Sequence, residues 1–391
     1  MDTAEDEGRR SADPDDPLSL VYVGSAENDF EHAGRVFALP PSSRVRFGRG
    51  EAFAVAAEAG GLTASVPLPW ASGAHCELQA RATPEGPRLW LRDLGSRNGT
   101  LLEGRRVEGE VPLALGRVFE VGRSFWTVRV QRTGGLSETS ALFAVVAPPL
   151  RHVGSVLERV ARSELPVLVI GETGTGKESI ARAIHERSGR AGAFVVVGVS
   201  AFGPERMEAE LGAGSRFAPG AARRGRGGTM YLADVGQLDG RAQVALLAAL
   251  ERLPAGEQGV RVVAGADREL RRSAGKGGHF RAELYSRLAG FEVRLPTLRE
   301  SPEDIGLMVR QLGHMGDRAR LRLSTPALRH LLGHSWPFNR EQLLACLTTA
   351  SMLPSTDGFI GEDVVRDALL GAHRSNLSLT DSEPPSGPLH H

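Results

Sequence analysis

A glycine-rich loop carries the clearest chemical signal in this chain, because residues 171–177 fit the phosphate-loop pattern G-x-x-x-x-G-K. The apolar residues 167–170 precede it and predict a buried strand, and residues 178–187 follow it and predict a helix. Backbone N–H groups of such a loop surround a polyphosphate, and the helix N-terminus adds partial positive charge. A plain turn between a strand and a helix is the alternative. We predict nucleotide binding, with the lysine at the β- and γ-phosphates, by Gly171, Glu172, Thr173, Gly174, Thr175, Gly176, Lys177 and Glu178.

The segments around this loop alternate between strand and helix patterns, which predicts a parallel α/β core. Further strands are predicted at residues 193–199, 228–234 and 260–266, and helices at 151–162 and 242–252. After Pro302 the pattern becomes helical, at residues 304–312, 325–332, 340–353 and 361–370. These last helices predict a small α-helical lid.

The first third of the chain has a different pattern of apolar and polar residues. Short runs of alternating apolar and polar residues fill residues 18–130, and clusters of Gly, Pro and Ser separate them. No segment between these runs repeats its apolar residues with the period of a helix for long enough to predict one. This spacing predicts an all-β sandwich.

The length of 391 residues suits two or three domains. We expect a multidomain chain with an N-terminal all-β sandwich, an α/β phosphate-loop core and a small α-helical lid. The expected boundaries are a disordered stretch at 1–17, the sandwich at 18–132, a linker at 133–148, the core at 149–299, the lid at 300–372 and a disordered tail at 373–391.

Composition excludes several classes of function. Lys+Arg and Asp+Glu both number 47, so no net charge recruits nucleic acid or a membrane. The two cysteines, Cys76 and Cys346, lie far apart and argue against a disulfide framework. The acidic N-terminus lacks the apolar segment of a signal peptide, and no apolar run is long enough to span a membrane. We expect a cytoplasmic protein without a membrane partner.

Three short motifs lie in loops of the predicted sandwich: Phe47-Gly-Arg49, Ser72-Gly-Ala-His75 and Asp93-Leu-Gly-Ser-Arg-Asn98-Gly-Thr100. The Asn98-Gly99 pair alone predicts only a hairpin turn. In this order and spacing, over about 110 residues, the motifs together resemble the forkhead-associated (FHA) domain.

The FHA resemblance implies binding of a phosphothreonine-containing protein. By motif, Arg49 and Ser72 contact the phosphate, Asn98 holds the peptide backbone and Arg97 assists, while His75 and Gly48 brace the loops. A guanidinium and a hydroxyl suit a dianionic phosphate. One departure is Gly73, since the family often has a basic residue after the serine. The alternative is a purely structural or self-docking sandwich.

Residues 149–353 resemble the AAA+ ATPase module of sigma-54 activators, the bacterial enhancer-binding proteins. The matching stretches are Gly171-Glu-Thr-Gly-Thr-Gly-Lys-Glu178, Glu208-Ala-Glu-Leu211, Gly227-Gly-Thr-Met-Tyr-Leu232, Phe280-Arg-Ala-Glu-Leu-Tyr-Ser-Arg-Leu288 and Ser335-Trp-Pro-Phe-Asn339. The resemblance implies a ring, homo-oligomeric or mixed with a paralogue, that binds ATP with Mg2+ and acts on sigma-54 RNA polymerase. It also makes Arg281 and Arg287 finger arginines that reach the γ-phosphate in the neighbouring subunit.

Several departures from this family fall on catalysis. The Walker B strand normally ends in Asp-Glu, but here it ends in Ala233-Asp234, so Asp234 is the candidate for both Mg2+ and the attacking water. A register slip that gives Asp234 to Mg2+ leaves Val235 in the place of the base. The sensor asparagine is matched by Asp267.

Two further departures lie in the lid and in the polymerase-contact loop. The lid arginine is matched by Glu341; Arg340 is adjacent, but one helical residue is a rotation of about 100°. In the loop at residues 216–221, Pro219 replaces the family's threonine.

Two hypotheses follow. The first is a sigma-54-dependent-type transcriptional regulator that senses Ser/Thr phosphorylation and hydrolyses ATP weakly or not at all, so its status as an enzyme stays open. The second is a catalytically inactive, nucleotide-gated phosphopeptide adaptor or scaffold. After the lid, no two helices with a basic recognition face remain, so we expect no sequence-specific DNA binding.

Overall fold

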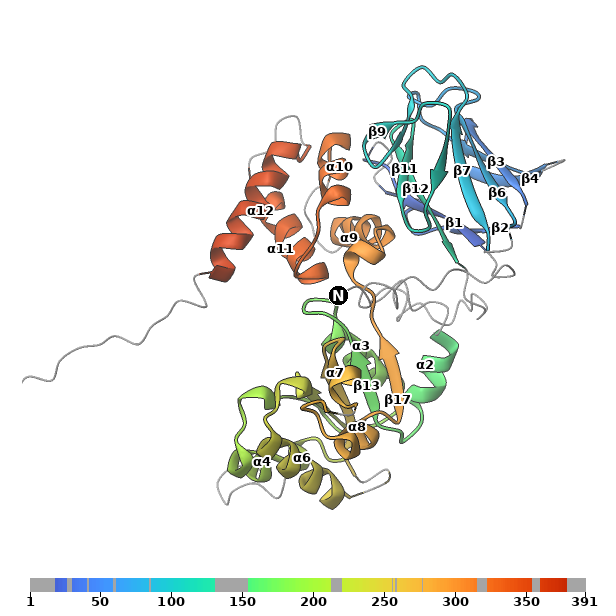
Figure 1. Cartoon of the computed structure of the whole chain (residues 1–391). Helices are drawn as coiled ribbons and strands as arrows, with labels where there is room; N and C mark the ends of the chain where they lie inside the picture. The colour runs from blue at the N-terminus through green and yellow to red at the C-terminus, as the bar shows by residue number, and fades with distance from the viewer. Residues whose placement is uncertain are drawn as a thin grey trace, which may run out of the picture. The chain divides into compact units, whose positions relative to one another are not determined.

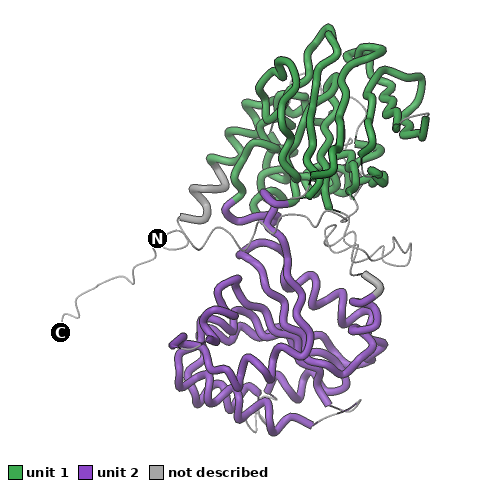
Figure 2. Tube along the Cα trace, turned by 45° about the vertical axis from the view of Figure 1, so that its right-hand side comes forward, with its two compact units in different colours: residues 1–132, 301–336, 342–391 green, residues 133–300, 337–341 purple. Residues whose placement is uncertain are grey.

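The computed structural model describes residues 18–26, 30–40, 42–58, 61–83, 86–130, 154–211, 220–254, 256, 259–275, 277–314, 322–353 and 359–377 (Figure 1). The predicted disordered start, the whole of the predicted linker, residues 216–219 of the loop through Pro219, and the predicted tail after residue 377 lie outside these residues. The chain divides into two compact units (Figure 2). The sandwich unit comprises residues 1–132, 301–336 and 342–391, and the sheet unit comprises residues 133–300 and 337–341.

The sandwich unit begins with two six-stranded sheets. One sheet has the order β2-β1-β12-β11-β8-β9, from Val36–Leu39, Leu18–Gly24, Ser124–Val130, Val118–Val121, Thr100–Leu102 and Arg105–Arg106. The other has the order β10-β7-β6-β3-β5-β4, from Glu110–Leu113, Arg88–Asp93, Cys76–Arg81, Arg44–Arg49, Gly61–Val66 and Ala54–Glu58. The pairs are antiparallel apart from β3 with β5.

Aromatic side chains fill the space between these two sheets. Tyr22, Phe47, Phe119 and Trp126 are fully buried, and the ring centres of Phe47 and Trp126 lie 5.2 Å apart at a steep angle. Such edge-on pairs add to the free energy gained by burying the rings. Cys76 is buried in the same core, and both cysteines are free, as the sequence predicts.

Four helices follow in the last part of the chain: α9 (Glu303–His314), α10 (Thr325–Gly333), α11 (Asn339–Met352) and α12 (Glu362–Leu377). They belong to the sandwich unit, except for the first three residues of α11, which belong to the sheet unit. We call them the lid helices. Helix α9 packs on β1, where a Cβ at Gly306 would lie 1.8 Å from the Val23 carbonyl oxygen. This close approach explains why every residue of β1 is buried, unlike a sandwich strand with one solvated face.

Ion pairs join the lid helices to the sandwich. Arg329 donates through two nitrogens to the Glu120 carboxylate, both at 2.7 Å, and the Glu120 side chain is 6% exposed. Arg129 donates to Glu303 at 2.7 Å. Sequence reasoning placed the lid next to the nucleotide core; these contacts group most of it with the sandwich.

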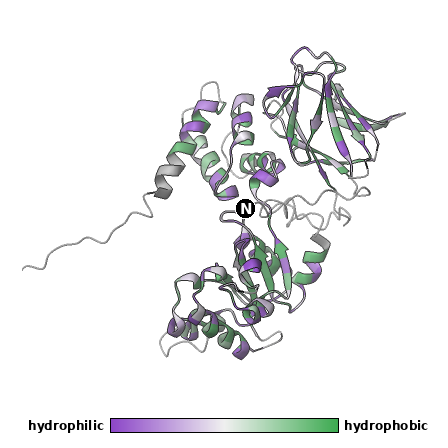
Figure 3. Cartoon of the chain, in the orientation of Figure 1, coloured by the Kyte–Doolittle hydropathy of each residue, from purple (hydrophilic) through white to green (hydrophobic). Residues whose placement is uncertain are grey.

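The sheet unit is built on a five-stranded parallel sheet of order β14-β15-β16-β13-β17. Its strands are Phe194–Gly198, Thr229–Ala233, Arg261–Ala266, Val167–Ile170 and Phe291–Arg294. Its helices are α2 (Gly154–Ala161), α3 (Lys177–Arg187), α4 (Pro204–Leu211), α5 (Ala221–Arg224), α6 (Gly240–Arg252), α7 (Leu270–Ser273) and α8 (Ala282–Leu288), with short 3-10 turns at Val199–Ala201, Val235–Gln237 and Leu298–Glu300. Figure 3 shows hydrophobic residues along the strands of this sheet.

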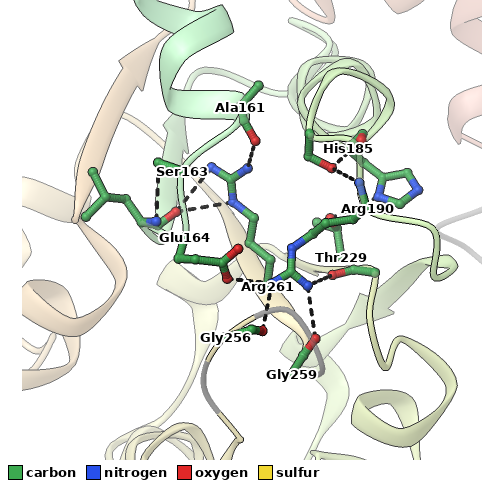
Figure 4. A network of polar contacts seen from close by, with 12 residues as sticks. Ala161, Ser163, Glu164, His185, Arg190, Thr229, Gly256, Gly259 and Arg261 are labelled. Carbon is green, nitrogen blue, oxygen red and sulfur yellow. Dashed lines mark hydrogen bonds and ion pairs between the residues drawn. The ribbon is translucent and has the colours of Figure 1, made fainter.

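Two buried arginines connect the parallel sheet to neighbouring segments through hydrogen bonds to backbone carbonyl oxygens (Figure 4). Arg261 on β16 donates to the carbonyl oxygens of Val160, Ala161 and Leu165 at the end of α2, and its burial lowers its pKa to about 10. Arg190 donates to Glu164 and to the carbonyl oxygens of Gly228 and Gly259.

The predicted fold class is confirmed, with differences in single elements. The strand predicted to be buried at residues 193–199 is the edge strand β14, so it is only partly buried and Val196 is 43% exposed. Helix α12 continues to Leu377, beyond the predicted end of the lid at residue 372, because no proline interrupts the chain before Pro384. Helix α4 and strand β17 were not predicted. None of the helices within the described residues has the length and hydropathy to cross a membrane.

Candidate functional site

The predicted nucleotide site lies at the carboxyl edge of the parallel sheet. Gly171 follows β13, Asp234 follows β15 and Asp267 follows β16, and β16 lies between the other two strands. Parallel strands place their carboxyl ends at one edge, which is where ligands bind in open α/β sheets. The structure therefore brings together the phosphate loop and the acidic residues that the sequence singled out.

The loop at residues 171–177 has the backbone that its glycines permit. Gly174 and Gly176 have φ values of 74° and 95°, and Gly176 is the residue from which α3 starts. A Cβ at Gly174 would lie 2.0 Å from the Phe338 carbonyl oxygen, so only glycine fits there. Lys177 Nζ donates to the carbonyl oxygens of Gly171 and Glu172, at 3.0 and 3.1 Å. The lysine thus points back into the loop.

Opposing influences act on Lys177. Burial lowers its pKa, while the carboxylates of Asp234, Asp267 and Glu341 favour the charged ammonium. All three carboxylates lie close enough to Lys177 to interact with its charge. An arriving polyphosphate brings more negative charge to this place, so a further cation is needed beside Lys177.

Sequence reasoning missed a polar network that holds the loop in place. Arg299 donates through two nitrogens to the Glu172 carboxylate, at 2.6 and 2.9 Å. Fully buried Asn339 donates to the Thr173 carbonyl oxygen at 2.9 Å and accepts from the Leu298 amide at 2.9 Å. The hydrogen bonds from Arg299, together with a longer one of 3.4 Å from Asn339 Nδ2 to the Glu172 carboxylate, lower the pKa of Glu172. Glu172 is therefore a loop-fixing residue in this structure.

The structure corrects the argument about Arg340. Its Nη1 lies 3.5 Å from the Thr175 carbonyl oxygen, and the Glu341 amide donates to the Gly174 carbonyl oxygen at 3.3 Å. The 100° rotation assumed a regular helix at this point. Residue 340 instead lies in the first turn of α11, directly after Asn339, whose φ is 49°. Both side chains of the Arg340-Glu341 pair thus belong beside the phosphate loop, and the guanidinium supplies a second cation.

The Walker B segment offers a single carboxylate. Ala233 ends β15 and packs against a hydrophobic cluster, and Val235 is fully buried in the core. Asp234 between them is exposed and has a left-handed φ of 55°. The register slip considered from the sequence therefore leaves Val235 inside the core, away from any attacking water.

The two predicted finger arginines lie at opposite ends of α8. Arg281 precedes the helix and its amide donates to Gln243 at 2.8 Å, whereas Arg287 lies in the last turn, with Nη2 3.5 Å from the Leu250 carbonyl oxygen. Both are exposed. Glu178, at the start of α3, pairs with Arg182 one turn later at 2.9 Å.

The predicted phosphopeptide site lies in the sandwich unit, where backbone and side-chain hydrogen bonds join the three loop motifs. The Arg49 amide donates to the Ser72 carbonyl oxygen at 2.8 Å, and the Arg97 amide donates to Ser72 Oγ at 3.1 Å. Asn98 Nδ2 donates to the Trp70 carbonyl oxygen at 2.7 Å. Arg49, Arg97 and Asn98 are exposed, so all the predicted contact residues gather around one loop at 70–72.

His75 braces these loops from inside. It is fully buried; its Nδ1 accepts from the Ser72 amide at 3.0 Å, and its Nε2 lies 3.2 Å from the Gly99 carbonyl oxygen. The first bond requires an unprotonated Nδ1, so Nε2 carries the proton. Burial lowers the pKa of His75, which favours this neutral form.

Asp93 organises the third motif. Burial alone raises its pKa, but hydrogen bonds from Thr100, Ser96 and the Gly95 amide outweigh that effect and lower it. The Ser96 and Thr100 hydroxyls both donate at 2.7 Å. The carboxylate thereby fixes the turn that carries Arg97 and Asn98.

Comparisons with known proteins match the two regions of the chain that carry these candidate sites. A family model for the sigma-54 interaction domain matches residues 144–294, and one for the FHA domain matches residues 45–122. The Nif-specific regulatory protein of Klebsiella pneumoniae is 38% identical over 251 residues, which cover 59% of this chain and 47% of that protein. The DNA-binding transcriptional regulator NtrC of Azospirillum brasilense is 34% identical over 245 residues, which cover 57% and 50%.

The chain spans about half the length of these curated relatives. Among solved structures, NtrX from Brucella abortus in complex with ATP is similar at a TM-score of 0.49 and 29% identity, covering 63% of this chain and 61% of that one. Both resemblances inferred from the motifs are confirmed by the family models. The chain thus carries an FHA domain followed by a sigma-54 interaction domain.

Proposed function

We propose that this chain is an ATP-binding regulator of sigma-54-dependent transcription that senses Ser/Thr phosphorylation through its FHA domain. The observation that carries the proposal is the presence of two phosphate-binding arrangements on one chain, the loop at Gly171–Lys177 and the FHA loops around Ser72. One takes a nucleotide and the other a phosphothreonine peptide.

The nucleotide arrangement supports ATP as the ligand. Left-handed glycines, the start of α3 and the Lys177 ammonium form a cradle for polyphosphate. Arg340 adds a guanidinium from the other side of the loop. If Mg2+ accompanies ATP, Asp234 is the carboxylate placed to hold it, since Ala233 has no ligand atom.

The same residues support slow hydrolysis or none. Catalysis of phosphoryl transfer depends on positioning the metal and the attacking water. One carboxylate, Asp234, stands where two are needed, and Val235 is buried in the core. This observation favours the second candidate function, an inactive nucleotide-gated phosphopeptide adaptor or scaffold that joins a ring of copies of itself or of an active paralogue.

ATP binding and turnover are measured best on one sample of full-length protein, by calorimetry and by a steady-state ATPase assay. We expect ATP to bind and Lys177→Ala to abolish binding. We expect turnover well below about 1 s⁻¹, the low end of kinase rates. Faster turnover that Lys177→Ala abolishes contradicts the inactive alternative.

A gain-of-function variant sharpens this test. The double change Ala233→Asp with Asp234→Glu restores a carboxylate pair at the end of β15, so ATPase activity should rise at least about tenfold. The matched control is Glu269→Asp, at an exposed residue outside the loop.

Contact with sigma-54 is tested by capture of purified sigma-54 on the full chain loaded with ADP and aluminium fluoride. Retention of sigma-54 above the level seen with ADP alone supports the regulator function. If sigma-54 is not retained although ATP binds, the adaptor function is supported instead.

A further inference from the structure

A cavity lies within the sandwich unit, where the FHA sandwich meets the lid helices. It has a volume of about 270 Å3. Ala26 and Arg123 line it from the sandwich, and Leu323, Pro326, Arg329 and Phe359 line it from the lid segment. The volume far exceeds the roughly 30 Å3 that one water takes in the liquid, so an amino-acid side chain fits.

Arg123 connects this cavity to the FHA loops. It lies in the turn between β11 and β12, and its guanidinium stacks on the Trp70 ring, 3.4 Å from the ring centre. The Trp70 carbonyl oxygen accepts the hydrogen bond from Asn98 Nδ2. Trp70 therefore links Arg123 to a predicted peptide-holding residue, through its ring on the Arg123 side and its backbone carbonyl on the Asn98 side, and it is 37% exposed.

The cavity wall is mainly apolar. Leu323, Pro326, Phe359 and Ala26 supply carbon surface, and the Glu120 carboxylate pairs with the Arg329 charge. Arg123 is the other cation in the lining. Such a wall favours an apolar side chain. The backbone carbonyl oxygen of the same peptide residue can accept a hydrogen bond from an arginine at the cavity rim.

The docking of the lid onto the sandwich makes this cavity preformed. Glu120 of the sandwich pairs with Arg329 of the lid, and lid helix α9 packs on sandwich strand β1. A preformed pocket binds without the entropic cost of ordering its walls.

We propose that this junction cavity is a second subsite for the FHA ligand. A polypeptide with its phosphothreonine at Arg49 and Ser72 continues past Trp70 and Arg123 and inserts one apolar side chain between Pro326 and Phe359. The inference rests on the proposed phosphopeptide function. It makes the sandwich together with the lid, and not the sandwich alone, the module that selects the partner.

The test uses full-length protein and a peptide library with a fixed phosphothreonine and randomised flanking positions. Wild-type protein should select Leu, Ile, Met or Phe at one flanking position. For the best selected peptide, Pro326→Glu and Phe359→Ala should each weaken binding about tenfold, as expected for loss of one buried apolar side chain. The phosphothreonine requirement should persist in both variants.

The two substitutions differ in their risk to folding. Pro326 is exposed and lies in the first turn of α10, where a glutamate favours the helix. Phe359 is partly buried, so its variant is used only if its thermal midpoint matches the wild type. Met352→Ala, at a lid side chain that is 65% exposed and outside the cavity, should leave selection unchanged.

The outcomes separate this inference from the proposed function. If phosphopeptides bind and Arg49→Ala abolishes binding, but Pro326→Glu leaves the flanking preference intact, the subsite is wrong and the FHA function stands. If the full chain enriches no phosphothreonine peptide over its unphosphorylated form, both are wrong.

Discussion

Arg340 lies where α11 begins, one position before the residue expected to contact the nucleotide. Its guanidinium reaches the phosphate loop because Asn339 turns the chain through a left-handed conformation. The charge-assisted contacts of a guanidinium with phosphate are stronger than neutral hydrogen bonds. Glu341 at the expected position opposes phosphate binding, so Arg340 offsets a substitution that otherwise weakens the site.

We therefore expect Arg340→Ala to weaken ATP binding about tenfold in calorimetry, since hydrogen bonds to charged groups contribute about 1.5–3 kcal/mol. Arg366→Ala serves as the control, because Arg366 is an exposed lid arginine that pairs within α12. Equal ATP affinity of both variants would exclude Arg340 from the site.

Gly73 follows the candidate phosphate-binding Ser72. A Cβ at Gly73 meets nothing within 4 Å, and its φ is outside the left-handed region. Gly73→Arg should fold normally and place a guanidinium beside the phosphate, so affinity for a phosphothreonine peptide should rise several-fold at low salt.

Fluorescence polarisation with phosphorylated and unphosphorylated forms of one library-selected peptide measures this gain. Gly203→Arg is the matched control, because Gly203 is an exposed glycine with equally open space in the sheet unit. A gain that is the same for both peptide forms refutes a role at the phosphate.

His75 lies directly before β6 and connects two of the FHA loops through its hydrogen bonds with Ser72 and Gly99. Because burial lowers the pKa of His75, the unfolded chain binds a proton more readily than the folded chain below about pH 6.5. The contribution of His75 to folding stability is therefore present above that pH. It is lost as the pH falls through the folded-state pKa.

Wild-type protein should therefore lose stability more steeply on acidification than the variant His75→Gln. The difference in slope is at most about 1.4 kcal/mol per pH unit, the value for one proton. Urea melts from pH 7.5 to pH 5.5, followed by tryptophan fluorescence, measure it. Burial also lowers the pKa of His32 and His185, and since both proteins retain these groups, their contribution cancels. Identical slopes would contradict the role of His75.

The sandwich unit combines segments from the start and the end of the chain. Glu120 is buried at the junction and is paired with Arg329 through two hydrogen bonds. Removal of the arginine leaves a buried carboxylate without its partner. Because Arg329 is itself 41% exposed and screened by solvent, the cost lies below the value of about 3–5 kcal/mol for a fully buried pair. The lid should therefore affect the stability of the FHA sandwich.

Arg329→Gln should lower the unfolding temperature of the sandwich, and the double change with Glu120→Gln should recover much of the loss. Differential scanning calorimetry of the full chain measures this double-mutant cycle. Arg366→Gln, at an exposed lid arginine that pairs within α12, is the control. Additive effects of the two substitutions would mean that the pair does not couple the lid to the sandwich.

The sequence by itself determined the strand–loop–helix order around Lys177, the alternating strands of the sandwich and the identity of both domains. These features depend on local periodicity and on motifs whose members lie close in the chain. It also identified the altered Walker B residues, Ala233 and Asp234.

Only the tertiary structure decided which distant residues meet. The pairs of Glu172 with Arg299 and Glu120 with Arg329 join segments far apart in the sequence, which no local pattern encodes. The place of Arg340 depends on the backbone angle at Asn339, and the burial of both faces of β1 depends on α9. Local periodicity sets which elements form, whereas packing sets which of their faces and charges come together.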